Sequence, residues 1–226
     1  MDHVYGIYFE GTIPGRPGQA YEPSGNGAFM AGFANVTEPR QGFLRGYGLE
    51  MAVETAWARF GRVKRDVRDR FWIGAFGEVL PDPDNRVELD RERLDACGIP
   101  TLRIHARHGA NELAMARDQV ATLREMLDAA NFEIHQEVTE PAPPGASAHE
   151  MGTARMGSDP ATSVLNSHNQ AWDVPNLYVT DAAAFTSSGH RNPTLTIMAL
   201  TVRACLHLSQ QLRSGDHDGE FLKPNR

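Results

Sequence analysis

The feature that most constrains the fold is a long apolar segment near the end of the sequence, PTLTIMALTVRACLHLSQQL at 193–212. It is apolar nearly all round as far as Leu206, and a helix of this kind has to be buried. Its most apolar part, residues 195–208, is too short to cross a membrane, and Arg203 and His207 interrupt it. Asn192 is a good helix cap, and Pro193 is favoured in the first turn. The sequence therefore predicts a buried helix that begins at residue 193.

A second helix and several strands are predicted from the spacing of apolar residues. Between 111 and 130 these residues recur at helical spacing and form one stripe: Leu113, Ala116, Val120, Leu123, Leu127 and Ala130. The segment TLRIHAR at 101–107 alternates in polarity, which predicts a half-buried strand with Leu102 and Ile104 on its apolar face. Further expected elements are a short helix at 50–60, strands at 71–80, 87–90, 132–138 and 176–181, and loops with short strands at 11–48.

These elements define the expected fold class. The segment PDPDNR at 81–86 carries turn residues, so strand 87–90 is expected to return beside strand 71–80 as a hairpin. The fold class is α+β, with an antiparallel sheet from strands near 71–80, 87–90, 101–107 and 132–138. Helix 111–130 is expected on one face of this sheet.

Charge and cysteine content exclude several classes of function. The 226 residues carry a formal net charge of −7 and no cluster of Lys or Arg, which argues against a nucleic acid or an anionic membrane as partner. Cys97 and Cys205 lie far apart in the sequence and form no ligand group, so no metal site is expected. The first residues have neither the basic nor the apolar region of a signal peptide. The chain as given is expected to be soluble, and its compartment stays open.

The segment HEMGTARMG at 149–157 is the first candidate for chemistry. Its glycines predict a loop that could bring His149 close to a planar ligand. A structural histidine explains this motif equally well. The segment is not a metalloprotease motif, because Thr153 stands where the second histidine would be needed. The helix N-terminus that follows Asn192 would favour an electron-rich ligand group, although ordinary capping explains Asn192 as well.

Together these segments resemble a known family. The stretch HEMGTARMGSDPATSVLNSHNQAWDVPNLYVTDAAAFTSSGHRNPTLTIMALTVRA at 149–204 is similar to the C-terminal signature of the glucose-methanol-choline (GMC) flavin oxidoreductases. Within that family it looks most like the gluconate, fructose and sorbitol dehydrogenase large subunits and pyranose oxidase. The segments GEVLPDPDNRVELD and IPTLRIHARHGANEL extend the resemblance toward the family's substrate-binding domain.

The resemblance implies FAD as cofactor, a sugar or polyol as substrate, and roles for particular residues. His149 and Asn192 would flank the substrate carbinol in front of the flavin, where a histidine suits proton transfer near neutral pH. Asp181 and Ala182 would lie near the ribityl and phosphate groups of FAD, and Pro193 and Thr194 at the flavin's pyrimidine edge. His190 does not match the motif and is expected to line the pocket or the surface.

The resemblance also implies that much of the family's FAD-binding domain lies outside these 226 residues. Met1-Asp2-His3 resembles an internal segment of family members, and no G-x-G-x-x-G segment is present to hold the FAD pyrophosphate. Expected divisions are a loop-rich segment at 1–70, a substrate-binding sheet and helix at 71–140, the family signature at 141–213 with a strand and helix of a Rossmann-like FAD domain, and a tail at 214–226.

Two functional hypotheses follow from this. The first is the C-terminal half of an oxidoreductase, inactive without an N-terminal FAD-binding part and served by an electron-acceptor subunit. The alternative is a non-catalytic remnant of such an enzyme.

Overall fold

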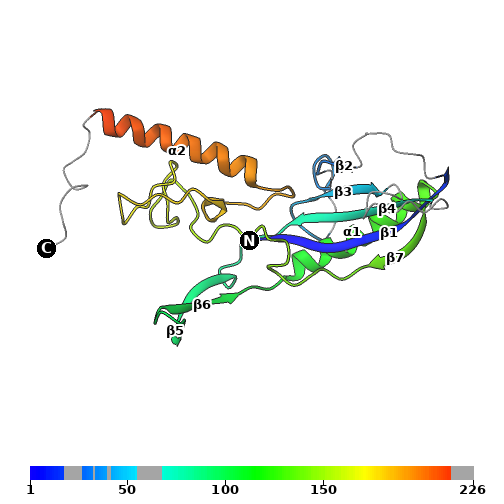
Figure 1. Cartoon of the computed structure of the whole chain (residues 1–226), viewed down its shortest axis with the longest axis horizontal. Coiled ribbons are helices and arrows are strands. Elements are labelled where there is room, and N and C mark those ends of the chain that lie inside the picture. Colours follow the sequence, from blue (N-terminus) through cyan, green and yellow to red (C-terminus); the bar gives the residue numbers. More distant parts are fainter. Residues whose placement is uncertain (18–26, 33, 40–41, 55–67, 215–226) are drawn as a thin grey trace.

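The computed structural model describes residues 1–17, 27–32, 34–39, 42–54 and 68–214. It has an elongated shape with three parts (Figure 1). One part is a five-stranded sheet covered by the first helix, the second is a loop region along which the last helix runs, and the third is a two-stranded ribbon. The start of the first strand lies where these three parts meet.

The main sheet is antiparallel and is built around its longest strand, β1 (His3–Pro17). β1 pairs with β4 (Arg68–Glu78) on one side and with β7 (Glu133–Val138) on the other. Beyond β4 follow β3 (Tyr47–Glu54) and β2 (Gly27–Met30), so the strand order is β2-β3-β4-β1-β7. The predicted strands 71–80 and 132–138 are thereby confirmed.

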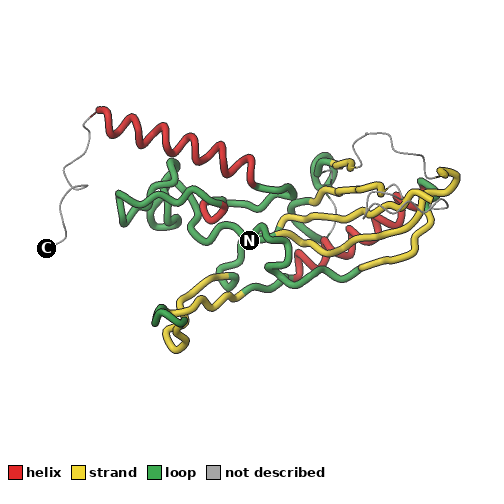
Figure 2. The backbone as a smooth tube through the Cα atoms, in the orientation of Figure 1, coloured by secondary structure: helices red, strands yellow, loops and turns green. Residues whose placement is uncertain are grey.

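Helix α1 (Ala110–Ala129) covers one face of this sheet, as the apolar stripe predicted. Leu123 and Leu127 are buried in one core with Phe9 and Ile73 of the sheet, whereas Leu113 stays exposed at the edge of the stripe. Figure 2 shows α1 as the helix lying along the strands. At the N-terminus of α1, Glu112 Oε2 accepts a hydrogen bond from the N–H of Gly109 at 2.9 Å, which satisfies an amide group just before the helix.

The sheet and helix approach each other closely at Gly77 of β4. A Cβ atom at this position would lie 2.3 Å from Met115 Sδ of α1 and 2.8 Å from Gln119 Nε2. A larger residue here would require the ends of the Met115 and Gln119 side chains to move. Helix α1 thus lies close to the C-terminal end of β4, which pairs with the start of β1.

The two strands that follow the turn at 81–85 form a separate ribbon, and this differs from the expected hairpin. β5 (Arg86–Leu94) pairs with β6 (Pro100–His105), not with β4. The reason is that both edges of β4 are already paired, one with β1 and the other with β3. The strand predicted at 101–107 is present as β6, but its predicted half-burial is wrong, because Leu102 and Ile104 are 63% and 68% exposed.

Two other local predictions need correction. Residues 50–54 belong to β3 and not to a helix, because they pair with β4; residues 55–60 of that prediction lie outside the described residues. Residues 176–181 form no strand, but only an isolated bridge between Tyr178 and Gln170. A single 3-10 turn, η1 (Ala182–Ala184), follows.

Helix α2 (Thr194–Ser214) is confirmed as a helix, but it is not buried in this chain. Ala204 is its one buried residue among those described. None of the described helices is long and apolar enough to cross a membrane. The division of the chain into four segments stays a prediction.

Candidate functional site

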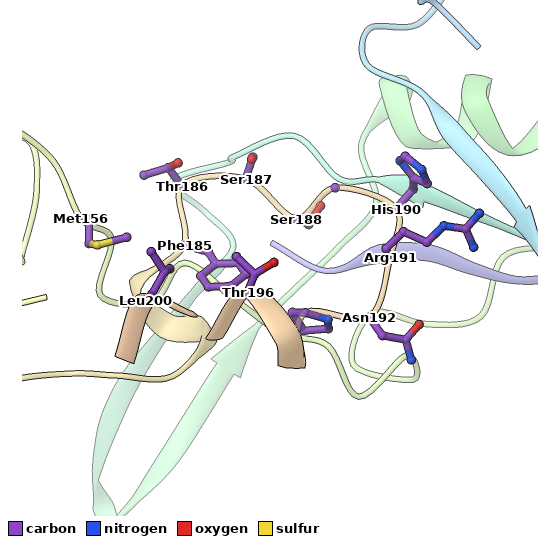
Figure 3. A pocket seen from close by; sticks show the side chains of 12 residues that line it. Met156, Phe185, Thr186, Ser187, Ser188, His190, Arg191, Asn192, Thr196 and Leu200 are labelled. Atoms are coloured by element: carbon purple, nitrogen blue, oxygen red, sulfur yellow. The ribbon is translucent and has the colours of Figure 1, made fainter. Parts of the chain in front are cut away.

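A cavity of about 410 Å³ lies where the segment after η1 turns into α2 (Figure 3). Its wall is formed mainly by consecutive residues of this segment, together with Met156 from the loop region and two residues of the first turns of α2. The lining residues that carry polar groups are Thr186, Ser187, Ser188, His190, Arg191, Asn192 and Thr196. The cavity therefore combines an apolar floor with several polar side chains, which is the usual composition of a ligand site.

Asn192 and Pro193 lie on this wall at the N-terminus of α2. Asn192 is exposed, and the carbonyl of the buried Pro193 accepts the first helical hydrogen bond from Ile197 N at 2.9 Å. The helix consequently begins at Thr194, one residue later than expected, and Thr194 is exposed. The first amide groups of α2 point toward this end without helical partners, so they can stabilise negative charge.

His190 and Arg191 anchor this segment to the β2–β3 hairpin. The N–H of Gly32 donates to His190 Nε2 at 2.9 Å, which places the ring proton on Nδ1. Burial, and then the charge of Arg191, lower the pKa of His190, so the ring is neutral at neutral pH. Cβ atoms at Gly32 and Gly48 would come within 2.6 Å of this ring, so both positions need glycine. His190 thus lines the cavity, as expected, and it fixes the backbone two residues before Asn192.

Arg191 adds two further contacts with the hairpin. Its guanidinium donates to the carbonyl of Met30 at 2.6 Å and lies over the ring of Phe29, 4.7 Å from its centroid. Nothing in the sequence motif indicated these contacts, because β2 lies about 160 residues away along the chain. Arg191 is a residue that sequence reasoning missed.

His149 lies in a separate loop that is held by the start of β1. The carboxylate of the buried Asp2 accepts from Gly145 N at 2.7 Å and from the hydroxyl of Ser147. Met151 exchanges backbone hydrogen bonds of 2.9 Å with Met1. His149 is half-buried between these two attachments, and its Nδ1 is buried with no hydrogen-bond partner among the described residues.

The structure brings the two predicted catalytic segments to one place, but it does not put their side chains in one cavity. His149 is not among the residues that line the cavity of Asn192. Instead, the ring of His149 contacts the ring of His3, with centroids 5.1 Å apart, and the backbone carbonyl of Gly189 lies near the ring of His3. That His149 and Asn192 act on the same substrate oxygen stays a prediction.

Asp181 and Ala182 have local structural roles in this chain. Asp181 Oδ1 accepts from Ala183 N at 2.8 Å and caps η1, and the carbonyl of Ala182 accepts from Gly152 N at 3.1 Å. The second contact ties η1 to the loop that carries His149. The carboxylate of Asp181 is exposed, and its expected position near the ribityl and phosphate groups of FAD stays a prediction.

Helix α2 presents two different faces. One face packs on the loop region: Thr201 Oγ1 donates to the carbonyl of Thr180 at 3.0 Å, and the ring of His207 stacks on His168 with centroids 3.7 Å apart. Four apolar side chains of the other face recur at helical spacing and are 58–79% exposed: Leu195, Met198, Val202 and Leu206. We call these four the α2 stripe. In Figure 1 no other element lies over this side of α2.

Comparison with known proteins assigns the segments of His149 and Asn192 to one protein family. A family profile described as GMC oxidoreductase matches residues 81–201, which include His149 and Asn192. A 2-methyl-1,2-propanediol dehydrogenase from Mycolicibacterium austroafricanum is 34% identical over 193 residues, covering 77% of this chain and 35% of that protein.

Two further relatives act on sugars according to their names. The fructose dehydrogenase large subunit of Gluconobacter japonicus is 31% identical over 146 residues, covering 63% of this chain and 26% of that protein. The pyranose 2-oxidase of Lyophyllum shimeji is 27% identical over 171 residues, covering 74% of this chain and 27% of that protein. The predicted resemblance is confirmed, and the chain spans 26–35% of the length of these three relatives.

Proposed function

Because the chain belongs to the GMC oxidoreductase family, whose members use FAD and oxidise CH–OH groups, we propose that it is part of an enzyme that oxidises a sugar or polyol. The hydroxyl-bearing carbon would give up a hydride to the flavin, and the hydroxyl would lose its proton, so that a carbonyl compound is formed. The observation that carries this proposal is that the family match includes both His149 and Asn192. It is supported by the convergence of their two segments at the start of β1.

The residues present fit one side of a flavin. The first turn of α2 offers unpaired amide groups beside a cavity, and Nδ1 of His149 is a buried polar atom without a partner among the described residues. Pro193 and Thr194 would lie at the pyrimidine edge of the ring, and Asp181 and Ala182 near the ribityl and phosphate groups. When bound, FAD supplies the hydride acceptor.

His149 and Asn192 would then have different roles at the substrate hydroxyl group. His149 would take the hydroxyl proton on Nε2, because Nδ1 is the nitrogen enclosed by protein. The exposed amide of Asn192 would donate a hydrogen bond to the same oxygen and hold the carbinol in place. His190 and Arg191 would keep Asn192 at the cavity by fixing the preceding backbone on the β2–β3 hairpin.

We further propose that activity needs an FAD-binding part besides these 226 residues. The sequence has no G-x-G-x-x-G segment, so it lacks the backbone cradle that holds the FAD pyrophosphate in dinucleotide-binding folds. One relative is named as a large subunit, which makes a separate electron-acceptor subunit a reasonable partner.

Stopped-flow flavin reduction tests the catalytic role of His149. In the flavin-containing enzyme that includes this chain, His149→Ala should slow flavin reduction by a sugar or polyol about 100-fold or more, with FAD still bound. His135→Ala, which changes an exposed histidine of β7, serves as the matched control and should react like the wild type. An unchanged rate in His149→Ala would refute its role as the base. A wild-type enzyme that binds FAD but is reduced by no alcohol would favour the non-catalytic alternative.

A further inference from the structure

Two histidine rings meet at the start of β1 in an environment that leaves their nitrogens without partners. His3 is 2% exposed, and neither of its ring nitrogens has a hydrogen-bond partner within the described part of the chain. The same holds for Nδ1 of His149. The two rings stand edge to face, with centroids 5.1 Å apart and an interplanar angle of 84°. Unpaired buried nitrogens are costly, so three of them at one contact indicate a functional arrangement.

The backbone on both sides of this contact is fixed. Asp2 holds Gly145 and Ser147, and Met1 holds Met151, so the loop is attached before and after His149. The ring of His3 also makes a T-shaped contact with the ring of Phe76 of β4, with centroids 6.3 Å apart. The relative position of the two histidine rings is therefore set by the sheet and not by a free loop.

To act as a base through Nε2, a neutral histidine has to carry its own proton on Nδ1. A neutral imidazole has one N–H and one acceptor nitrogen, and the hydrogen bond made by one nitrogen determines which of them is protonated. For His149 to accept a proton on Nε2, its own proton has to lie on the buried Nδ1. Without an acceptor beside Nδ1, that proton would be unpaired, and the other tautomer would compete.

We propose that His3 is a positioning residue that selects the tautomer of His149: it accepts a hydrogen bond from Nδ1–H of His149 and so keeps Nε2 free for the substrate proton. The inference rests on the proposed function and adds to it a residue that contacts neither substrate nor flavin. The two rings lie in contact without a formed hydrogen bond, and bonds of this kind commonly shorten when substrate is bound.

The surroundings of His3 allow it to act as this acceptor. Burial lowers the pKa of His3, and the charge of a protonated His149 would lower it further, whereas Asp2 and the nearby carbonyls of Gly189 and Gly77 act in the opposite direction. His3 is therefore neutral at neutral pH, with one acceptor nitrogen. In the neutral ring one nitrogen carries an N–H that can donate to one of these carbonyls, and the proposal assigns the other nitrogen as the acceptor for His149.

The direct test is the tautomer of His149, measured from ring ¹⁵N shifts by solid-state NMR on the histidine-labelled, FAD-containing enzyme that includes this chain. His149→Gln identifies the signals. In the wild type, the Nδ1–H form should dominate. In His3→Phe, which keeps a ring but removes the acceptor, the Nε2–H form should rise to about half or more, because nothing selects Nδ1–H. His3→Gln restores an acceptor and should keep Nδ1–H dominant.

Flavin reduction should follow the tautomer. His3→Phe should lower the limiting rate about tenfold or more with little change in the substrate concentration for half saturation, and His3→Gln should recover most of it. The control His135→Phe should change neither measurement. A dominant Nε2–H form in the wild type would overturn the inference even if His3→Phe does not fold. If His149→Ala is impaired while His3→Phe keeps both tautomer and rate, the proposed function stands and this inference fails.

Discussion

The exposed α2 stripe leads to a prediction about how this chain joins the FAD-binding part of the enzyme. We consider the double variant Val202→Glu with Leu206→Lys, which makes the C-terminal half of the stripe polar. Both replacements are compatible with a helix, and a Glu four residues before a Lys is the favourable order for an ion pair. The net charge of the chain does not change, so any effect comes from polarity at this face.

The structure gives the size of the expected effect. The four side chains of the stripe are 58–79% exposed, and burial of one such side chain contributes about 1.5–3 kcal/mol. Only the exposed part of each side chain, about two thirds, is still to be buried, so covering all four would contribute about 4–8 kcal/mol. This is of the same order as the stability of a whole domain, about 5–15 kcal/mol. In the chain alone these residues already face water, so the double variant should change its free energy of unfolding by less than about 0.5 kcal/mol.

Two assays measure the effect of the double variant, one on the chain alone and one on the chain together with an FAD-binding part. For the chain alone, sedimentation velocity should show less aggregation in the double variant than in the wild type. When the chain is co-expressed with an FAD-binding half of the family, the double variant should lose most of the bound flavin absorbance. Leu212→Gln is the control, because Leu212 is equally exposed but lies off the stripe. Full retention of flavin by the double variant would refute the reasoning that the FAD-binding part covers this face.

Three further predictions concern the chain as given. Purified alone, it should be colourless and inactive toward sugars and polyols with a dye acceptor; stoichiometric FAD and turnover would contradict the need for a further FAD-binding part. Gly11→Ala should destabilise the fold by about 2 kcal/mol or more in urea unfolding, because the new Cβ would lie 1.9 Å from the carbonyl of Glu133, whereas Gly27→Ala, with its nearest contact at 3.6 Å, should be neutral. Burial lowers the pKa of His3, so its contribution to the free energy of unfolding is complete above the ordinary histidine pKa of about 6.5 and is lost as the pH falls below it. The urea midpoint of His3→Phe should therefore depend less on pH between about 7.5 and 5.5 than the midpoint of the wild type.

The elements that the sequence predicted correctly are those with a strong local signal. The apolar stripe of α1 extends over about five turns at helical spacing, and α2 was recognised from the length of its apolar run and from the Asn-Pro pair before it. The turn at 81–85 was also recognised from its residues, and Asp82 indeed accepts hydrogen bonds from Asp84 and Asn85 within it. What a turn does not determine is the partner of the strand that follows it.

Strand pairing was mispredicted because it depends on which sheet edges other strands occupy. β1 pairs along both of its edges, and its partners lie about 60 and about 125 residues away in the sequence, so no local pattern signals either pairing. Residues 50–54 were assigned to a helix for the same reason, since their pairing with β4 decides the conformation.

The candidate site shows the same division between local and distant signals. His149, Asn192 and Pro193 were found because they lie in continuous motifs, but the residues that orient them come from the opposite end of the chain. Asp2 holds the loop of His149 across more than 140 residues, and His190 is held by Gly32 across 158. The family resemblance did mark Met1-Asp2-His3, but it gave these residues no role. Their position is set by β1, which carries His3 to the place where the two predicted catalytic segments meet. If these segments act as proposed, a substitution in the first three residues should disturb the chemistry more than the motif alone would suggest.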